Sequence, residues 1–359
     1  MAKIDSGLEN VVAAETVLSR VDGKKGELVI RGREIEDIAS SMTFEQLIHH
    51  LWSGFFDDLP SEEDLGRKLG VARVEAFNKI APLAPFLKGQ PPLEAIRTAF
   101  SITPDGNDID SAVSAIAYML VATGIVGRLL NDSELVEPSA SRSHAEDLLY
   151  MLSGETPSAE LIAGANSYLV TVADHGLNAS TFTARVVAST QAGLGSAVIA
   201  GFCALKGPLH GGAPGPVLDM IDSIGSVGNA KAWAENALDK GERLMGFGHR
   251  VYKIKDPRAD ALKTASSKIP GSIGRLNFAR EVETIIIDTL IEKKPDRVLE
   301  TNVEYYTAVL LEALNVDREL FTGIFGCGRC VGWIAHSREQ MASKRIVRPK
   351  SVYVGPEPN

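Results

Sequence analysis

Apolar residues recur at helical spacing along almost the whole chain after Arg33. Thr43 has the residue type and position of an N-cap, and Phe44–Ile48 after it places its apolar residues at helical spacing. Thr156 before a proline predicts a further helix over Pro157–Ala173. Because no succession of strand patterns that would build a parallel sheet is present, the sequence predicts a mainly α protein.

The N-terminal region has a strand pattern instead. Thr16–Val21 and Glu27–Ile30 flank the Gly- and Lys-containing turn Asp22–Gly26. We expect these two segments to pair as antiparallel strands. The pair is short and precedes the helical part of the chain, so it leaves the predicted class unchanged.

The balance of charge limits the classes of partner. The chain has 37 Lys and Arg against 46 Asp and Glu, a formal charge of −9. A net acidic protein does not attract nucleic acid or acidic lipid over long distances, so we expect neither as a partner. Any anionic ligand must then be bound by a local group of Arg, Lys and His, which makes the positions of these residues informative.

Cysteine usage and apolar stretches bear on the compartment. The three cysteines fit a reducing environment and argue against a disulfide scaffold. The acidic N-terminus has no apolar signal-peptide core. Two stretches resemble membrane spans, Ala112–Leu130 and Arg185–Leu205, but their Ala, Gly and polar content indicates closely packed buried helices. We therefore expect a cytoplasmic protein.

Breaks in composition suggest two domains, as the length of 359 residues also does. The Gly- and Pro-rich segment Lys206–Pro216 is the strongest break, and the charged helical segments Ala230–Arg243 and Ala279–Lys294 follow it. We predict a small domain over residues 212–311, inserted between residues 1–211 and 312–359 of a large domain. A cleft between domains is a favoured ligand site.

Three of the seven histidines lie in loop contexts beside Gly or Pro: His175, His210 and His249. Glycines allow a ligand to approach an imidazole closely, although each such histidine could also simply satisfy loop hydrogen bonds. Their spacing does not match a helical zinc site, and Cys327 and Cys330 form a single CxxC without a second pair. We expect no metal, and we expect the two cysteines on neighbouring turns of a buried helix.

The basic residues are unevenly distributed. Four of them follow His249 within nine positions: Arg250, Lys253, Lys255 and Arg258. Arg329 lies inside an apolar segment, and Arg348 lies near the C-terminus. An Arg in apolar surroundings needs a partner, because an unpaired buried charge is costly. That partner is either a carboxylate of the protein or a carboxylate of a substrate, which the planar guanidinium binds in bidentate fashion.

Glu304 begins an apolar helical segment within Thr301–Tyr306. A carboxylate there could simply favour the helix N-terminus through the helix dipole, or it could be a positioned general base. The sequence has no P-loop, no dinucleotide-binding turn and no nucleophilic Ser or Cys triad.

Taken together, these motifs resemble the citrate synthase family. Gly207–Pro214, Gly246–Arg258 and Asn302–Thr307 occur in that family's order and spacing, and the resemblance extends from Leu8–Gly32 to Leu320–Pro356. The resemblance implies a two-domain, almost all-α fold, a homodimer, and an active site in each interdomain cleft. It also implies the condensation of acetyl-CoA with oxaloacetate to give citrate and CoA, without a metal or redox cofactor.

The resemblance assigns roles residue by residue. His210 matches the residue that polarises the thioester carbonyl, His249 matches the one that hydrogen-bonds the ketone, and Glu304 matches the catalytic base. The oxaloacetate ligands are His175, Arg258, Arg329 and, from the other subunit, Arg348. The positions where basic residues meet the CoA phosphates are Arg250, Lys253 and Lys255.

One position departs from the family pattern, since the usual catalytic Asp is Glu304 here. The carboxylate remains on a longer arm, which we interpret as a working base. Three alternatives stay open from the sequence. A 2-methylcitrate synthase would use propionyl-CoA, because one methylene changes preference by only about 1–3 kcal/mol. A weakly active carboxylate-binding regulator and a citryl-CoA lyase are the other two, and the retained histidines and arginines and the chain length disfavour them.

Overall fold

The computed structural model describes residues 7–8, 11–212, 214–249, 252 and 254–358. Its strands are β1 (Ser19–Asp22), β2 (Glu27–Ile30) and β3 (Arg33–Glu34), and three short 3-10 helices lie at Ala81–Leu83, Val227–Asn229 and Arg318–Leu320. Helices α1 to α8 are Ile35–Ser41, Phe44–Trp52, Glu62–Ile80, Ala84–Leu87, Pro92–Phe100, Ile109–Leu130, His144–Ser153 and Ala159–Val172. Helices α9 to α16 are Ala179–Ala188, Leu194–Leu205, Pro214–Ile224, Ala230–Asp239, Pro257–Ser266, Ile273–Lys293, Val303–Ala313 and Phe321–Ala342. The prediction of a mainly α protein is confirmed.

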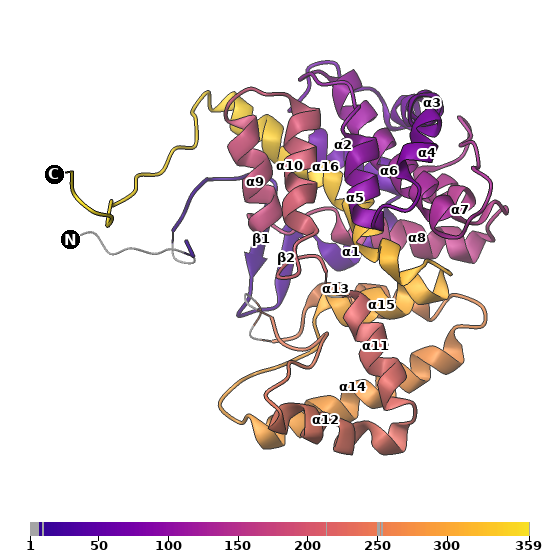
Figure 1. Ribbon diagram of the computed structural model, residues 1–359, viewed down its shortest axis with the longest axis vertical. Helices are drawn as coiled ribbons and strands as arrows, with labels where there is room; N and C mark the ends of the chain where they lie inside the picture. The colour runs from indigo at the N-terminus through magenta and orange to yellow at the C-terminus, as the bar shows by residue number, and fades with distance from the viewer. Residues whose placement is uncertain (1–6, 9–10, 213, 250–251, 253, 359) are drawn as a thin grey trace.

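The strands form one small antiparallel sheet in the order β1-β2-β3. Ser19 pairs with Ile30 and Asp22 with Glu27, so the predicted pairing is correct, although β1 begins three residues later than Thr16. Asp22 Oδ1 accepts hydrogen bonds from the backbone N–H groups of Lys24 and Lys25, which closes the turn. The sheet leads the chain into α1 at the edge of the helical body (Figure 1).

Local capping sets where the helices begin. Thr43 caps α2 with a reciprocal capping box to Gln46, as predicted. The predicted start at Thr156 is wrong: the N-cap of α8 is Ser158, whose hydroxyl accepts the N–H of Leu161. Serine is as good an N-cap as threonine, and this one is placed to satisfy a free N–H group of the first turn.

The apolar stretches are core helices. The stretch Ala112–Leu130 lies within α6, which is long and apolar enough to cross a membrane by composition, but 78% of its most apolar window is buried in the protein. The other stretch is divided into α9 and α10 by a turn in which Gln191 and Gly193 have positive φ. Cys327 and Cys330 are buried on α16, as predicted.

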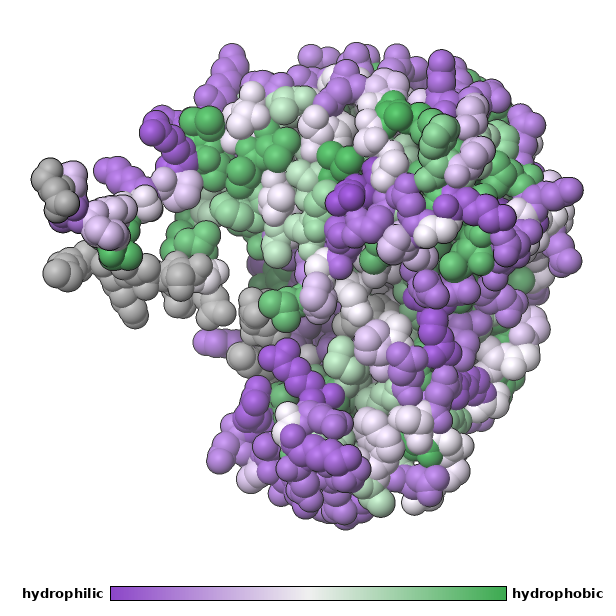
Figure 2. Space-filling model, viewed as in Figure 1, coloured by the Kyte–Doolittle hydropathy of each residue, from purple (hydrophilic) through white to green (hydrophobic). Residues whose placement is uncertain are grey.

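In Figure 1 the helices α11, α12 and α14 occupy the lower end of the molecule, and α13 and α15 lie between them and the larger upper body. Hydrophilic side chains dominate the lower end in Figure 2. Helices α13 and α15 both pack on α8, and α13 also packs on α1. Segments on either side of the predicted boundary at residue 212 therefore meet closely, and the boundaries at 212 and 311 remain a prediction.

Helix α16 approaches α8 closely because of a glycine. A Cβ atom on Gly328 would lie 2.9 Å from the carbonyl oxygen of Leu169 and 2.6 Å from Val172 Cγ2. Any larger residue would force the two helices apart. This contact fixes the depth at which the next residue, Arg329, is buried.

Candidate active site

The structure brings together six of the predicted site residues: His175, His210, His249, Arg258, Glu304 and Arg329. They come from different elements. His175 lies between α8 and α9, His210 between α10 and α11, and His249 in the loop before α13. Arg258, Glu304 and Arg329 lie in α13, the first turn of α15, and the middle of α16, respectively. Their convergence is the geometry of an enzyme site for an anionic substrate.

Arg329 is a buried cation without a carboxylate partner among the described residues. Only 1% of the residue is exposed. Its Nε donates to the carbonyl oxygen of Val172 at 2.5 Å, and its guanidinium lies 5.0 Å from the centroid of the Phe325 ring. Burial lowers the pKa of Arg329 to about 10, which still leaves it charged at neutral pH. An uncompensated buried charge favours the binding of an anion.

Arg258, unlike Arg329, is paired with a carboxylate of the protein. Its Nε and Nη2 donate to Asp256 at 3.0 and 2.8 Å, and the backbone N–H of Val303 donates to the same carboxylate at 3.3 Å. The protein therefore orients this guanidinium. Among the described residues no hydrogen bond involves its Nη1, so this edge is available to a ligand. The shared carboxylate also ties Arg258 to the start of α15, which carries Glu304.

Tyr252 links two of the histidines. Its hydroxyl lies 3.1 Å from His175 Nε2, and its backbone N–H donates to His249 Nδ1 at 3.1 Å. The second bond occupies Nδ1 as an acceptor, so neutral His249 carries its ring proton at Nε2 and can donate it. Burial and the nearby Arg258 and Arg329 charges hold the pKa of His175 well below its usual range. Sequence analysis did not select Tyr252, although it lies in the same motif as His249.

His210 is held in its neutral form. Burial and the Arg329 charge lower its pKa to about 4. Its Nε2 lies 2.8 Å from the hydroxyl oxygen of Ser180, which accepts from Trp333 Nε1 and donates its proton to Asn178 Oδ1 at 2.8 Å, so the hydroxyl must turn away from Asn178 to donate to His210. When the Ser180 hydroxyl turns toward His210, the ring proton must lie at Nδ1, where it can be donated to a ligand.

Glu304 has the electrostatics of a base. Asn302 caps α15 and accepts the backbone N–H of Glu304, which places the carboxylate in the first turn. Burial raises the pKa of Glu304 to about 7, with Arg258 and Arg329 opposing the rise and Asp256 adding to it. No described side chain hydrogen-bonds the carboxylate. A carboxylate with a pKa near neutrality can both accept and return a proton at neutral pH.

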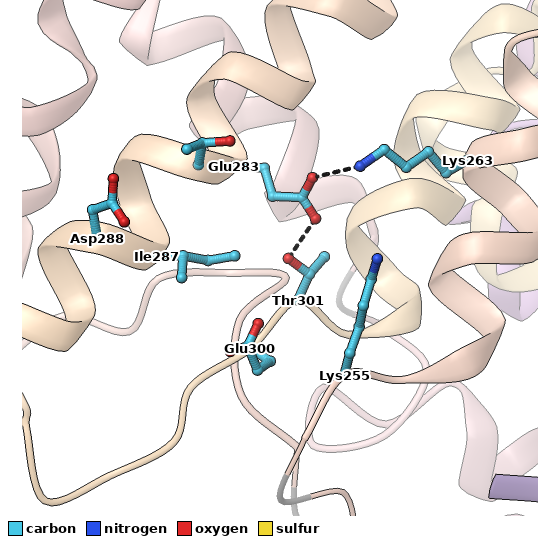
Figure 3. Close-up of a pocket in the computed structure, with 8 residues that line it drawn as sticks. Lys255, Lys263, Glu283, Ile287, Asp288, Glu300 and Thr301 are labelled. Carbon is cyan, nitrogen blue, oxygen red and sulfur yellow. Dashed lines mark hydrogen bonds and ion pairs between the residues drawn. The ribbon is translucent and has the colours of Figure 1, made fainter. Parts of the chain in front are cut away.

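The remaining predicted residues are not in this group. Arg348 is exposed on the C-terminal segment, which leaves the body beyond α16 (Figure 1). Arg250 and Lys253 lie outside the described residues. Lys255 pairs with Asp260 and lines a pocket with Lys263, Glu283, Asp288, Glu300 and Thr301 (Figure 3). Because three carboxylates offset two ammonium groups there, that pocket has no excess of positive charge.

Among the described residues no group of three or more His, Cys, Asp or Glu side chains has a metal-binding arrangement. The described residues instead form a site in which two guanidinium groups and three imidazoles lie around the Glu304 carboxylate, and Asp256 binds one of the guanidinium groups. Such a set suits proton transfer beside a bound carboxylic acid.

Comparison with known proteins identifies the family. The family model described as "Citrate synthase, C-terminal domain" matches residues 7–350. A protein named putative citrate synthase 2, from Mycobacterium tuberculosis, is 38% identical, with 98% of this chain and 93% of the relative covered. The citrate synthase of Haloferax volcanii is 36% identical, with 98% and 96% covered. The chain belongs to the citrate synthase family.

Solved structures agree with this assignment. The crystal structure of citrate synthase from Thermotoga maritima superposes with a TM-score of 0.86 at 32% identity and covers 99% of this chain and 97% of that one. Citrate synthase from Thermoplasma acidophilum, in a ternary complex with carboxymethyl coenzyme A and oxaloacetate, has a TM-score of 0.86 at 29% identity, with 99% and 97% covered. The predicted citrate synthase fold is confirmed.

The raised pKa of Glu304 predicts a specific pH dependence of stability. Between about pH 4.5 and 7 the folded protein binds more protons at this group than the unfolded chain does, so its contribution to the free energy of unfolding falls as pH rises. We expect Glu304→Gln to abolish this fall in the free energy of unfolding, because glutamine does not titrate. Its melting temperature should exceed that of the unmodified protein by a few degrees at pH 8 and by much less at pH 4.5. A melting-temperature difference that stays constant over this range would contradict the raised pKa.

Proposed function

We propose that the protein condenses acetyl-CoA with oxaloacetate and hydrolyses the resulting thioester to release citrate and CoA. The observation that carries this proposal is the buried guanidinium of Arg329, which forms no ion pair with any described carboxylate. Near it lies Glu304, whose pKa is close to neutrality. Membership of the citrate synthase family supports the same reaction. Oxaloacetate is a dianion at neutral pH, and the facing guanidinium groups of Arg258 and Arg329 suit its carboxylates.

The first chemical step is removal of a proton from the methyl group of acetyl-CoA. In its ionised form Glu304 accepts this proton, while negative charge grows on the thioester oxygen. His210 donates from Nδ1 to that oxygen. A neutral imidazole is a sufficient donor here, and the low pKa of His210 keeps it neutral at every pH at which Glu304 is ionised.

The second step is attack of the enol carbon on the ketone of oxaloacetate. His249 donates from Nε2 to the ketone oxygen as that oxygen gains charge. The arginines and His175 hold the dianion so that one face of the ketone meets the enol. Water then hydrolyses the citryl thioester. No electrons are transferred, so we assign coenzyme A as a substrate and propose no cofactor or metal. The basic residues assigned to its phosphates are Arg250, Lys253 and Lys255.

We also propose a homodimer in which Arg348 completes the partner's site. The C-terminal segment extends from the body on the same side as the N-terminal segment (Figure 1). Apolar side chains gather over α9 and α10 on this side (Figure 2). Val12, Ile346, Val352 and Val354 are exposed on these segments, which suits burial against a second copy. Residues 212–311 form the small domain in this proposal, and the three free cysteines fit a cytoplasmic location.

A second candidate activity is 2-methylcitrate synthesis from propionyl-CoA. A protein named 2-methylcitrate synthase, from Mycobacterium tuberculosis, is 32% identical with 99% of this chain covered. The same base and hydrogen-bond donors would serve both reactions. Only the shape of the acyl pocket distinguishes the two substrates.

The activity is tested by following free thiol from acetyl-CoA and from propionyl-CoA, each with and without oxaloacetate. We expect CoA release that requires oxaloacetate and is faster with acetyl-CoA. Release without any keto acid would indicate a simple thioesterase. No release with either acyl-CoA would favour a carboxylate-binding regulator over an enzyme.

The dimer is tested by mixing two inactive variants, Arg348→Ala and His249→Ala. If Arg348 acts on the partner subunit, each mixed dimer has one site with both residues intact, and activity should return to about a quarter of the unmodified level on statistical grounds. Mixed dimers can be confirmed with two different affinity tags. Tagged mixed dimers that form but stay inactive would show that Arg348 acts within its own subunit.

A further inference from the structure

Tyr168 has a buried hydroxyl group without a hydrogen-bond partner. The residue lies in α8 and is 1% exposed, and no described atom meets hydrogen-bond geometry with its Oη. Other tyrosines near the site are satisfied: Tyr305 donates to the carbonyl oxygen of Ala279 at 2.7 Å, and Tyr306 donates to Glu283. Buried hydroxyl groups are nearly always paired in folded proteins. The unpaired hydroxyl of Tyr168 therefore indicates a hydrogen-bond partner that becomes available only when substrate is bound.

The position of Tyr168 shows which partner is near. Val172 lies one turn further along the same face of α8, and its carbonyl oxygen accepts from Arg329. On the other side, the hydroxyl of Thr307, one turn beyond Glu304 in α15, is close enough to lower the pKa of the phenol, although its geometry falls short of a hydrogen bond. The charges of both Glu304 and Arg329 act on the phenol and are the two largest charge effects on it. Tyr168 thus lies near both the proposed base and the proposed carboxylate-binding arginine.

Among the carboxylates described around Glu304, that of Glu304 itself is the one without a hydrogen-bond donor in the described part of the chain. Arg258 and Arg329 are donors themselves. Asp256 accepts from Arg258 and from the backbone N–H of Val303, and Asp174 accepts from His336 and Gly176. Glu283, on the neighbouring α14, accepts from Thr301, Tyr306 and Lys263. Among the described residues, the hydroxyl of Tyr168 is thus a donor without an acceptor, and the carboxylate of Glu304 is an acceptor without a donor.

We propose that Tyr168 is a positioning residue for the base, and that its hydroxyl donates a hydrogen bond to the ionised Glu304 carboxylate when oxaloacetate is bound. This inference rests on the proposed function. A bound dianion neutralises the positive charges of Arg258 and Arg329, which without substrate stabilise the ionised form of Glu304. The ionised carboxylate then needs another donor, and Tyr168 supplies it. The high pKa of the buried phenol keeps its proton in place throughout turnover.

The test is Tyr168→Phe, with Tyr118→Phe as a control. Tyr118 is also a buried tyrosine, but it lies on α6 outside the site. A hydrogen bond to the charged form lowers the pKa of a carboxyl group, so its loss should raise the pKa of Glu304. We expect the acid limb of kcat/KM for the acyl-CoA, at saturating oxaloacetate, to move up by about one pH unit, and kcat at pH 7 to fall about fivefold, because the ionised fraction of Glu304 drops from about one half to about one tenth. The affinity for oxaloacetate should stay within about twofold.

A measurement that does not depend on turnover separates this inference from the proposed function. The pKa of Glu304 can be read from carboxyl-labelled glutamate by 13C NMR with oxaloacetate bound, using Glu304→Gln to assign its signal. An equal pKa in the unmodified protein and in Tyr168→Phe would overturn the inference. Loss of oxaloacetate affinity with the pKa unmoved would also overturn it, because the phenol would then bind the substrate. Failure of the proposed function itself appears in the unmodified protein alone, as absence of CoA release.

Discussion

The site depends on the buried guanidinium of Arg329, which has no ion-pair partner among the residues that the structure describes. Among the described residues, Arg329 Nε donates to one carbonyl oxygen and its guanidinium lies over one aromatic ring, while the carboxylates of Asp174 and Glu304 act on its charge without forming an ion pair. A buried ion of this kind destabilises the folded state. A dianionic ligand that pairs with it stabilises the folded state again. The fold supports this arrangement in simple ways. Gly328 lets α16 approach α8, and the carbonyl oxygen of Val172 orients the guanidinium edge.

The positive charge of the buried arginines also influences the protonation of the other groups in the site. Burial keeps His175 and His210 neutral, helped by the charge of Arg329 at both and of Arg258 at His175, so these imidazoles act as hydrogen-bond partners and not as additional cations. Burial alone would raise the pKa of Glu304 further, and the arginines limit this rise so that the group titrates near neutrality. One electrostatic environment thus provides an anion site, two neutral donors and a base. Oxaloacetate changes this balance when it binds, which couples substrate binding to the readiness of the base.

Sequence patterns predicted this site to different extents. Local signals were sufficient for the N-cap at Thr43, the buried helix that carries the two cysteines and the helix start near Glu304, because these depend on neighbouring residues. The α8 start was misplaced by two residues, since Thr156 and Ser158 are equally good caps and only tertiary structure chooses between them. Partners distant in sequence were not predictable. The carboxylate beside Arg258, the unpaired Tyr168 hydroxyl and the absence of an acidic partner for Arg329 all depend on how separate helices meet.

The central claim is that Arg329 is held without a protein counterion in order to bind oxaloacetate. It is tested most directly with Arg329→Met, by thermal unfolding without ligand and by calorimetric titration with oxaloacetate. Arg73→Met is the control, because Arg73 is fully buried and paired with Asp147 at 2.7 Å. The account predicts that Arg329→Met unfolds at the same or a higher temperature and binds oxaloacetate at least about a hundredfold more weakly, whereas Arg73→Met lowers the melting temperature and keeps its affinity. An Arg329→Met protein that is destabilised as strongly as Arg73→Met and still binds oxaloacetate would contradict it.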